Sequence, residues 1–347
     1  MYHRILRRAA RWCVRRGTAR ERGCRMIAVV TAVLSIAAAG SSDANAQAGY
    51  PAKPVRYLVP FAIGGTNDIV GRIVAQKLSE RFGQQVIVDN RGGAGGTLAA
   101  EVVARAAPDG YTILQGNPGP STIAASLTRN LAYDPVKDFA PVMLVSVAPL
   151  VLVMHPSLPA RNVKEFIALV KSNPGRFSYA TSSQGSINHL AMELLQEAAG
   201  IDVLHVPYKG TGAAMTDLLS GQIQMTLAGI PPVQAFLNSG RLRALAVSGA
   251  KRTELLPDTP SFVELGYADV EVYTWAGLLL PRQTPASIVT RWHSETVNVL
   301  REPAVKERFR ALGVEAVGNT PAEFAVFLKA EIAKWARAVK KAGINLN

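Results

Sequence analysis

Residues 55–82 read VRYLVPFAIGGTNDIVGRIVAQKLSERF, and this stretch decides the fold class. Val55–Pro60 is predicted to be a buried strand. Asp68–Phe82 is predicted to be a helix, because its apolar residues recur at the spacing of one helix face and Gly83 follows. The turn between them contains Gly64-Gly65, where the backbone can approach a ligand closely. Strand, turn and helix in this order predict βαβ units with a parallel sheet.

Three further glycine-rich turns lie where a strand-like run gives way to a helix-like run. They are Asn90–Gly96, Ser182–Ser186 and Tyr208–Gly212. A helix N-terminus offers unpaired N–H groups and a partial positive charge. Several such turns that face one cleft would hold a small anion, and no catalytic chemistry would be needed.

The same alternation of strand and helix continues along the chain. We see no flexible linker, so a chain with two domains is expected to cross between them more than once, near Val145–Val151 and Thr274–Leu280. The further strands are expected at Gln85–Asp89, Tyr111–Gln115, Leu150–Met154, Phe177–Ala180, Val203–Val206, Gln224–Leu227, Leu242–Val247 and Glu271–Leu280. The further helices are expected at Thr97–Ala106, Val163–Ser172, Ile187–Ala199, Ala213–Ser220, Pro232–Asn238, Pro285–Leu300, Pro303–Leu312 and Pro321–Lys341.

The first 46 residues have the organisation of a signal peptide. Residues 1–25 carry nine Arg and one acidic residue, Met26–Ala39 is almost wholly apolar, and Ala44-Asn45-Ala46 fits a cleavage site. The apolar run is shorter than the ~20 residues that a membrane-spanning helix needs. We therefore expect cleavage after about Ala46 and a periplasmic location. An amphipathic surface helix is the alternative.

Removal of this leader changes the charge and the cysteine content. The whole chain carries a net charge of +13. Residues 1–46 contribute nine Arg against Glu21 and Asp43, a net charge of +7, so the remainder of the chain carries +6. No basic run with interleaved aromatic residues remains, so we expect no nucleic-acid partner. Both cysteines, Cys13 and Cys24, lie in the leader, which excludes a disulfide or a thiol nucleophile in the remainder.

Catalytic motifs are incomplete. The turn at Gly93 begins like a dinucleotide fingerprint but has Leu98 in the third glycine position. His189 and Glu193 are spaced to share a helix face, although a structural hydrogen bond explains such a pair better than a metal. Asp68, in a first helical turn, is expected to complement the helix dipole rather than to act as a base. We expect no catalytic residue, no metal and no cofactor.

A set of landmarks resembles one family, the periplasmic solute receptors of tripartite tricarboxylate transporters, also called the Bug family. The resemblance runs from about Tyr50 to the C-terminus, and eight landmarks occur in the family's order. They are Val59-Pro60-Phe61 with Gly64-Gly65 and Asp68; Asn90-Arg91 with Gly93-Ala94-Gly95-Gly96; Pro108-Asp109-Gly110-Tyr111; Tyr133-Asp134-Pro135; Gly185-Ser186 with His189; His205-Val206-Pro207-Tyr208-Lys209-Gly210; Leu256-Pro257-Asp258; and Trp275-Ala276-Gly277.

The resemblance implies an α/β fold of the two-lobed periplasmic-binding-protein (type II-like) kind, with mainly parallel sheets, flanking helices and hinge strands between the lobes. Lobe one would comprise residues 47–147 plus 278–347, and lobe two residues 148–277. It also implies a non-enzymatic, monomeric receptor that captures a small carboxylate and delivers it to a membrane permease. The implied ligand-binding residues are Phe61, Gly65, Thr66, Asn67, Asp68, Gln184, Gly185, Ser186 and Tyr208.

Departures from the family pattern bear on the ligand. Ile63 replaces a common proline, Ala99 a common glycine, and Gln224–Gly229 lacks the usual acidic residue and asparagine. The last change favours a less polar acid. Two alternative functions stay open: a secreted α/β enzyme that uses Asp68 or the Ser186/His189 pair, and a receptor that serves a sensor kinase.

Overall fold

The computed structural model describes residues 49–341, and from Pro51 onward the chain forms one compact unit. The predicted signal peptide lies outside the described residues. Within residues 49–341, no helix is long and apolar enough to cross a membrane.

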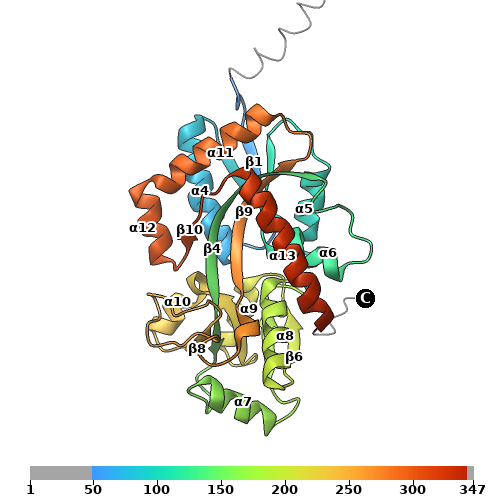
Figure 1. Ribbon diagram of the computed structural model, residues 1–347. Coiled ribbons are helices and arrows are strands. Elements are labelled where there is room, and N and C mark those ends of the chain that lie inside the picture. The colour runs from blue at the N-terminus through green and yellow to red at the C-terminus, as the bar shows by residue number, and fades with distance from the viewer. Residues whose placement is uncertain (1–48, 342–347) are drawn as a thin grey trace, which may run out of the picture. The chain divides into compact units, whose positions relative to one another are not determined.

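The first half of the sheet is built from strand–helix–strand units (Figure 1). Strand β1 lies between β2 and β3 and is parallel to both, with Val55 opposite Val86 and Arg56 opposite Thr112. This geometry follows the sequence, because each pair of strands is joined by a helix or a long turn. The elements are β1 (Val55–Val59), α4 (Thr66–Phe82), β2 (Val86–Asn90), the 3₁₀ turn η1 (Ala94–Gly96), α5 (Thr97–Ala104), β3 (Thr112–Gly116), the π-helix η2 (Gly119–Ile123) and α6 (Ala124–Leu127).

The second half repeats this organisation. Strand β5 lies between β6 and β7 and is parallel to both. The elements are α7 (Val163–Lys171), β5 (Ser178–Thr181), α8 (Ile187–Ala199), β6 (Leu204–Pro207), α9 (Thr211–Leu219), β7 (Met225–Gly229), α10 (Ile230–Asn238), β8 (Arg243–Val247) and the 3₁₀ turn η3 (Ala268–Val270).

Two long strands join the halves. β4 (Phe139–Met154) is antiparallel to β9 (Tyr273–Pro281) along Phe139–Pro149, and it pairs with β7 and β8 beyond Leu150. Figure 1 shows β4 (green) and β9 (orange) side by side through the middle of this unit. The chain ends with α11 (Ala286–Arg301), α12 (Pro303–Ala311), β10 (Glu315–Ala316), which pairs with β4, and α13 (Pro321–Lys341).

The two-lobed α/β fold is confirmed, and the sheet is mixed rather than mainly parallel. The pairings made by β1 and β5 are parallel. Every pairing made by β4 or β9 is antiparallel. The predicted boundaries between the lobes stay a prediction.

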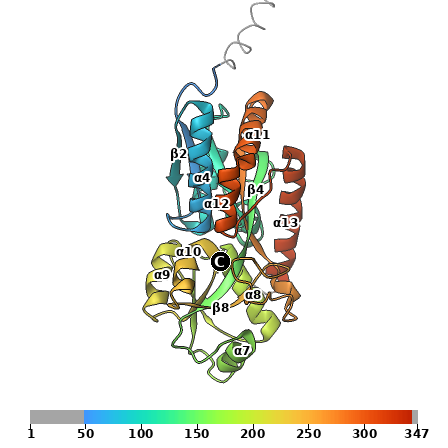
Figure 2. The same cartoon turned by 90° about the vertical axis from the view of Figure 1, so that its left-hand side faces the viewer.

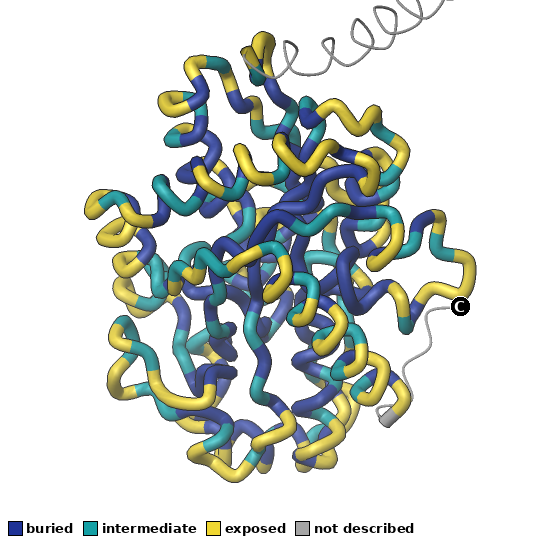
Figure 3. The backbone as a smooth tube through the Cα atoms, turned by 45° about the horizontal axis from the view of Figure 1, so that its top comes forward, coloured by how far each residue is buried: buried dark blue, intermediate teal, exposed yellow. Residues whose placement is uncertain are grey.

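The core lies along the central strands, which are the darkest part of the tube in Figure 3. Helix α13 contributes to two hydrophobic clusters. Its Phe324 packs edge-on against Trp275 of β9, whereas Trp335 lies in the cluster that includes Leu152 and Phe166. Figure 2 shows α13 alongside both halves of the sheet. Trp275 is buried against this helix through Phe324 and Phe327.

Candidate functional site

Four helix N-termini meet at one small cavity between the two halves of the sheet. Helix α4 brings residues from the first half, and α8, α9 and α10 bring residues from the second half. The cavity has a volume of about 40 Å³. It is lined by Phe61, Gly65, Thr66, Asn67, Asp68, Asn117, Gly119, Leu150, Ser182, Ile187, Asn188, Thr211, Gly229, Pro232 and Thr274.

The N-termini at this cavity lack side-chain caps. The residues that precede α4, α8, α9 and α10 are Gly65, Ser186, Gly210 and Gly229, and none of them makes a capping hydrogen bond through a side chain. By contrast, α7 lies away from the cavity, and its N-terminus is capped by Asn162. The first N–H groups of an uncapped helix remain available to a ligand, and the dipole favours an anion there. Helix α10 adds fewer donors, because its first turn contains two prolines without an N–H.

The two halves approach each other closely around the cavity. A Cβ atom added at Gly229 would lie 2.0 Å from the Thr66 hydroxyl oxygen, and one added at Gly210 would lie 2.5 Å from Cβ of Ala62. Both contacts join a turn of the first half to the start of a helix of the second half. The structure is therefore closed over the cavity.

Asp68 is held by three donors and is 2% exposed. Its carboxylate accepts hydrogen bonds from the Gly64 N–H (2.9 Å) and the Asn90 side-chain amide (2.9 Å), and forms an ion pair with Arg72 Nε (3.0 Å). Arg72 also donates to Asn90 Oδ1 (2.9 Å), which closes the network. This arrangement fixes the turn before α4, and it gives both oxygens of the Asp68 carboxylate a donor.

The predicted ligand-binding residues divide into two groups. Phe61, Gly65, Thr66, Asn67 and Asp68 line the cavity, as does the start of α8. The other four, Gln184, Gly185, Ser186 and Tyr208, do not line it in this closed form.

Two of these four are engaged elsewhere. The Ser186 hydroxyl donates to the Ser183 carbonyl (2.7 Å) rather than to a histidine. The Tyr208 hydroxyl donates to Asp217 (2.5 Å), and burial together with this bond raises the pKa of Tyr208 to about 12.

Two stacked histidines, His189 and His205, lie next to the turn Ser182–Ser186 and support it. The rings of His189 and His205 lie 4.1 Å apart, and His205 also stacks on Tyr179. His189 Nδ1 accepts the Gly185 N–H (3.3 Å), so His189 positions the turn that precedes α8. Burial lowers the pKa of His205 to about 4; burial and the neighbouring His205 lower the pKa of His189 to about 3.

Glu193 lies beside these two histidines, but the three side chains do not form a metal site. Its carboxylate accepts the Tyr179 hydroxyl (2.5 Å) and the Gln196 amide (2.9 Å), and it lies 3.8 Å from His189 Nε2. Among the described residues, no group of three His, Cys, Asp or Glu side chains is arranged to hold a metal ion.

The sequence analysis missed several polar residues that line the cavity, above all Asn117 and Thr274. Asn117 follows β3 in the turn Gly116-Asn117-Pro118-Gly119, which is not one of the four turns singled out from the sequence, and Thr274 lies on β9. Asn188, at the start of α8, donates to the Leu227 carbonyl and accepts from the Ser182 hydroxyl (3.3 Å). These residues are separated widely in the sequence and meet only after the two halves have folded.

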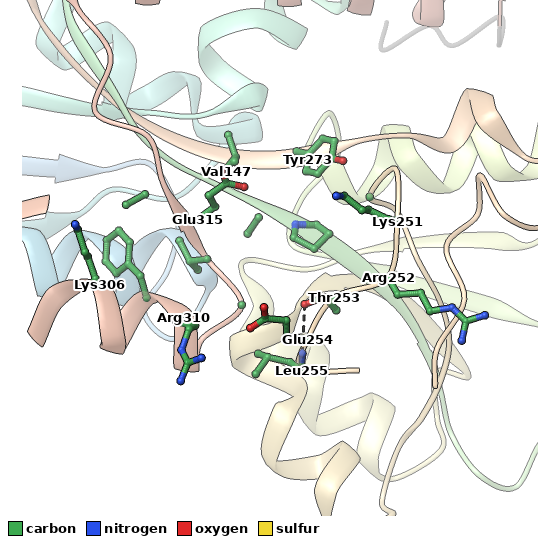
Figure 4. A pocket seen from close by; sticks show the side chains of 17 residues that line it. Val147, Lys251, Arg252, Thr253, Glu254, Leu255, Tyr273, Lys306, Arg310 and Glu315 are labelled. Carbon is green, nitrogen blue, oxygen red and sulfur yellow. Dashed lines mark hydrogen bonds between the residues drawn. The ribbon is translucent and has the colours of Figure 1, made fainter. Parts of the chain in front are cut away.

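A larger cavity, about 530 Å³, opens on the opposite face of the joining strands (Figure 4). Pro149 and Tyr273 line it, whereas their neighbours Leu150 and Thr274 line the small cavity, because successive strand residues point to opposite faces. Figure 4 shows Lys306 and Arg310 of α12 on one side of it and Lys251–Leu255 on the other. None of the predicted ligand-binding residues lines this cavity.

The comparisons with known proteins decide the family. Residues 70–344 match the model of the tripartite tricarboxylate transporter family receptor. The chain belongs to this receptor family. The resemblance inferred from the landmarks is therefore confirmed.

Individual relatives agree with the family. The protein BugT of Bordetella pertussis is 35% identical over 322 residues, which cover 92% of this chain and 97% of BugT. Among solved structures, R. palustris Rpa4515 with adipate has a TM-score of 0.83 at 35% identity and covers 85% of this chain and 99% of its own. MatC from Rhodopseudomonas palustris with bound malate has a TM-score of 0.80 at 33% identity. The match covers 84% of this chain and 100% of the MatC chain. The chain is a solute-binding receptor of the periplasmic binding protein kind.

Proposed function

We propose that this receptor captures one small carboxylate between the two halves of its sheet and delivers it to a membrane permease. The observation that carries the proposal is the convergence of uncapped helix N-termini on one closed cavity. Backbone N–H groups at such termini bind an anion without a cationic side chain. The two relatives that were solved with a ligand, Rpa4515 with adipate and MatC with malate, support a carboxylate as the anion.

The size of the cavity requires movement. One water molecule needs a cavity volume of roughly 10–15 Å³. A cavity of about 40 Å³ therefore holds little more than the carboxylate end of an acid. A complete ligand therefore enters while the halves are apart, and the cavity has to enlarge locally to enclose the body of the acid. Closure around β4 and β9 brings the α8 and α9 N-termini towards a ligand already held at α4.

Apolar lining residues limit how polar the ligand can be. The side chains of Phe61, Leu150, Ile187 and Pro232 offer no hydrogen bonds to a ligand, which supports an acid with a partly apolar body. The residues Gln224–Gly229 add little on this side, because the Thr226 hydroxyl already donates to the Ala180 carbonyl (2.8 Å).

The enzyme alternative has less support from the geometry. The Asp68 carboxylate already takes three donors, and the Ser186 hydroxyl donates to the Ser183 carbonyl rather than to His189. Neither residue has the partner that a nucleophile or a general base requires.

A binding screen tests the proposal. The protein without its leader is mixed with small mono-, di- and tricarboxylates, neutral sugars and divalent cations, and its melting temperature is measured. Saturable stabilisation by a carboxylate, with the acid recovered intact, is the expected result, because a ligand that binds only the folded state raises its stability. Stabilisation by sugars or cations alone, or consumption of the acid, would contradict it.

A further inference from the structure

Asn117 carries a buried, unpaired amide at the wall of the cavity. It is 1% exposed and lines the cavity, yet neither its side-chain nitrogen nor its side-chain oxygen has a hydrogen-bond partner among the described residues. Such groups are rare in folded proteins, since a buried polar atom without a partner lowers stability. No other side chain that lines the cavity has both polar atoms buried in this way.

The local structure holds this amide rigidly. Only the N-cap residue Pro118 separates Asn117 from the π-helix η2, an element that often occurs at functional sites. The Tyr133 hydroxyl donates to the Pro120 carbonyl (2.6 Å), and the Thr122 hydroxyl donates to the Pro118 carbonyl (2.8 Å), so the segment is tied at two points. A binding group on a segment fixed in this way is preorganised for its ligand.

Close packing places the amide beside the residues of the first glycine turn. A Cβ atom added at Gly119 would lie 3.5 Å from Asn117 Oδ1 and 3.6 Å from Cζ of Phe61. Asn117 and the start of α4, where the carboxylate is proposed to bind, both line this cavity.

The chemistry of an amide defines the ligand edge that it fits. Its Nδ2 donates and its Oδ1 accepts, side by side, so it pairs best with an acceptor and a donor on neighbouring atoms, as asparagine does with adenine. A 2-hydroxycarboxylate has this edge: a carboxylate oxygen accepts, and the hydroxyl on the next carbon donates. A plain carboxylate would satisfy Nδ2 and leave Oδ1 without a donor.

An ammonium group in place of the hydroxyl fits less well. Asp68 is the one acidic residue that lines the cavity within residues 49–341, and its oxygens already take donors from Gly64, Asn90 and Arg72. An ammonium group would lose its hydration without gaining a free carboxylate.

We infer that Asn117 determines specificity for 2-hydroxycarboxylates, by pairing its amide with the ligand's hydroxyl and one carboxylate oxygen. The inference rests on the proposed function, since it assumes that a carboxylate occupies this cavity. The hydroxyl lies at the carboxylate end, so it is compatible with an apolar body further along the acid.

Matched ligand pairs test this inference. Calorimetric dissociation constants are measured for malate and succinate, and for lactate and propionate, with aspartate and alanine as the amino analogues. Of malate and lactate, the acid that the wild-type protein binds more tightly should bind roughly fivefold to 150-fold better than its deoxy partner. This range corresponds to one buried polar group left unpaired. In Asn117→Leu, of similar size, this preference should fall to about threefold or less.

Ser121→Ala is the matched control. The Ser121 hydroxyl is also buried without a partner, but it does not line the cavity, so the control should keep the preference of the wild type. The melting temperature of ligand-free Asn117→Leu should equal or exceed that of the wild type, since an unpaired amide is removed. A lower melting temperature would assign Asn117 a structural role and overturn the inference; Asn117→Ala repeats the binding test in a smaller side chain.

Three other results would also overturn it. The first is wild-type binding of the deoxy acids as tightly as the hydroxy acids, and the second is equally tight binding of the amino analogues. The third is an unchanged preference for hydroxy acids in both Asn117→Leu and Asn117→Ala, as expected if the amide holds only a water. Binding of acids with an unchanged preference would reject the inference alone. Failure of every carboxylate in the wider screen to bind would reject the proposed function as well.

Discussion

Thr66 at the start of α4 lies directly against Gly229 at the end of β7, so close that a Cβ atom on Gly229 would be 2.0 Å from the Thr66 hydroxyl oxygen. This contact joins the two halves of the sheet at the edge of the cavity. Any side chain at position 229 would force either the Thr66 side chain or the two turns to shift.

Gly229→Ala should therefore hold the cleft partly open and weaken ligand binding. We expect roughly tenfold or greater loss of affinity, since closure would cost more than about 1.4 kcal/mol extra. Titration calorimetry measures it. Gly212→Ala is the control, because its Cβ would meet only the Ile63 carbonyl oxygen at 3.8 Å. Equal losses in both variants, or none in Gly229→Ala, would contradict the role of this contact.

Asp68→Asn should lower both stability and affinity. The amide would replace an acceptor oxygen by a donor opposite Gly64, Asn90 or Arg72, so at least one of these donors would be left unpaired. A cost of about 1–3 kcal/mol in the free energy of unfolding is expected. Urea denaturation of Asp68→Asn measures this cost. Arg72→Gln is the comparison, because it leaves the Asp68 carboxylate intact as an acceptor. An unchanged midpoint would show that the network does not fix the turn.

The stacked histidines predict acid sensitivity. In the unfolded chain their pKa is the ordinary value of 6.5, whereas in the folded chain it is about 3 for His189 and about 4 for His205. The unfolded state therefore binds more protons between these values, so stability is complete above about pH 6.5 and is lost as the pH falls towards 4 and below. Each unit of difference corresponds to about 1.4 kcal/mol.

His205→Phe should flatten this dependence, because a phenyl ring can keep the stack on Tyr179 and His189 but cannot be protonated. Urea denaturation at several pH values between 4.5 and 7.5 measures the slope. His155→Phe, at a position outside the stack, is the control. A slope in His205→Phe equal to that of the wild type would assign the acid sensitivity to other groups.

Ligand binding should also make the protein more compact. Because β4 and β9 join the halves, closure around them would decrease the radius of gyration that small-angle scattering reports. The comparison is made with and without saturating acid, and Gly229→Ala should show a smaller decrease. A radius that does not change at saturation would favour binding to a preformed closed cavity.

The sequence predicted the fold well where a local pattern defined each element. The stretch from β1 to α4 combines a short apolar strand, a double glycine and a helical spacing, and it folds as expected. The start of β4 was missed: a strand was expected from Leu150, whereas β4 begins at Phe139. Pro141 and Pro149 interrupt this run, and prolines usually indicate strand edges. Here the register shift between Pro141 and Met143 accommodates the first of them.

The candidate site was predictable only in its local part. The turn Gly64–Asp68 lies at the cavity because the sequence places it at a helix N-terminus. Asn117 and Thr274 come from elements more than 150 residues apart in the chain, and no spacing rule connects them. Their chemistry appears only when β3 and β9 pair and the second half of the sheet closes over them.

The most direct test of the central claim is a crystal structure of the protein with the acid that stabilises it most. We predict that the ligand carboxylate lies within hydrogen-bond distance of the N–H groups at the start of α4 and α8, with Asn117 beside it. A ligand bound instead in the larger cavity of Figure 4, between Lys251 and Arg310, would contradict the account.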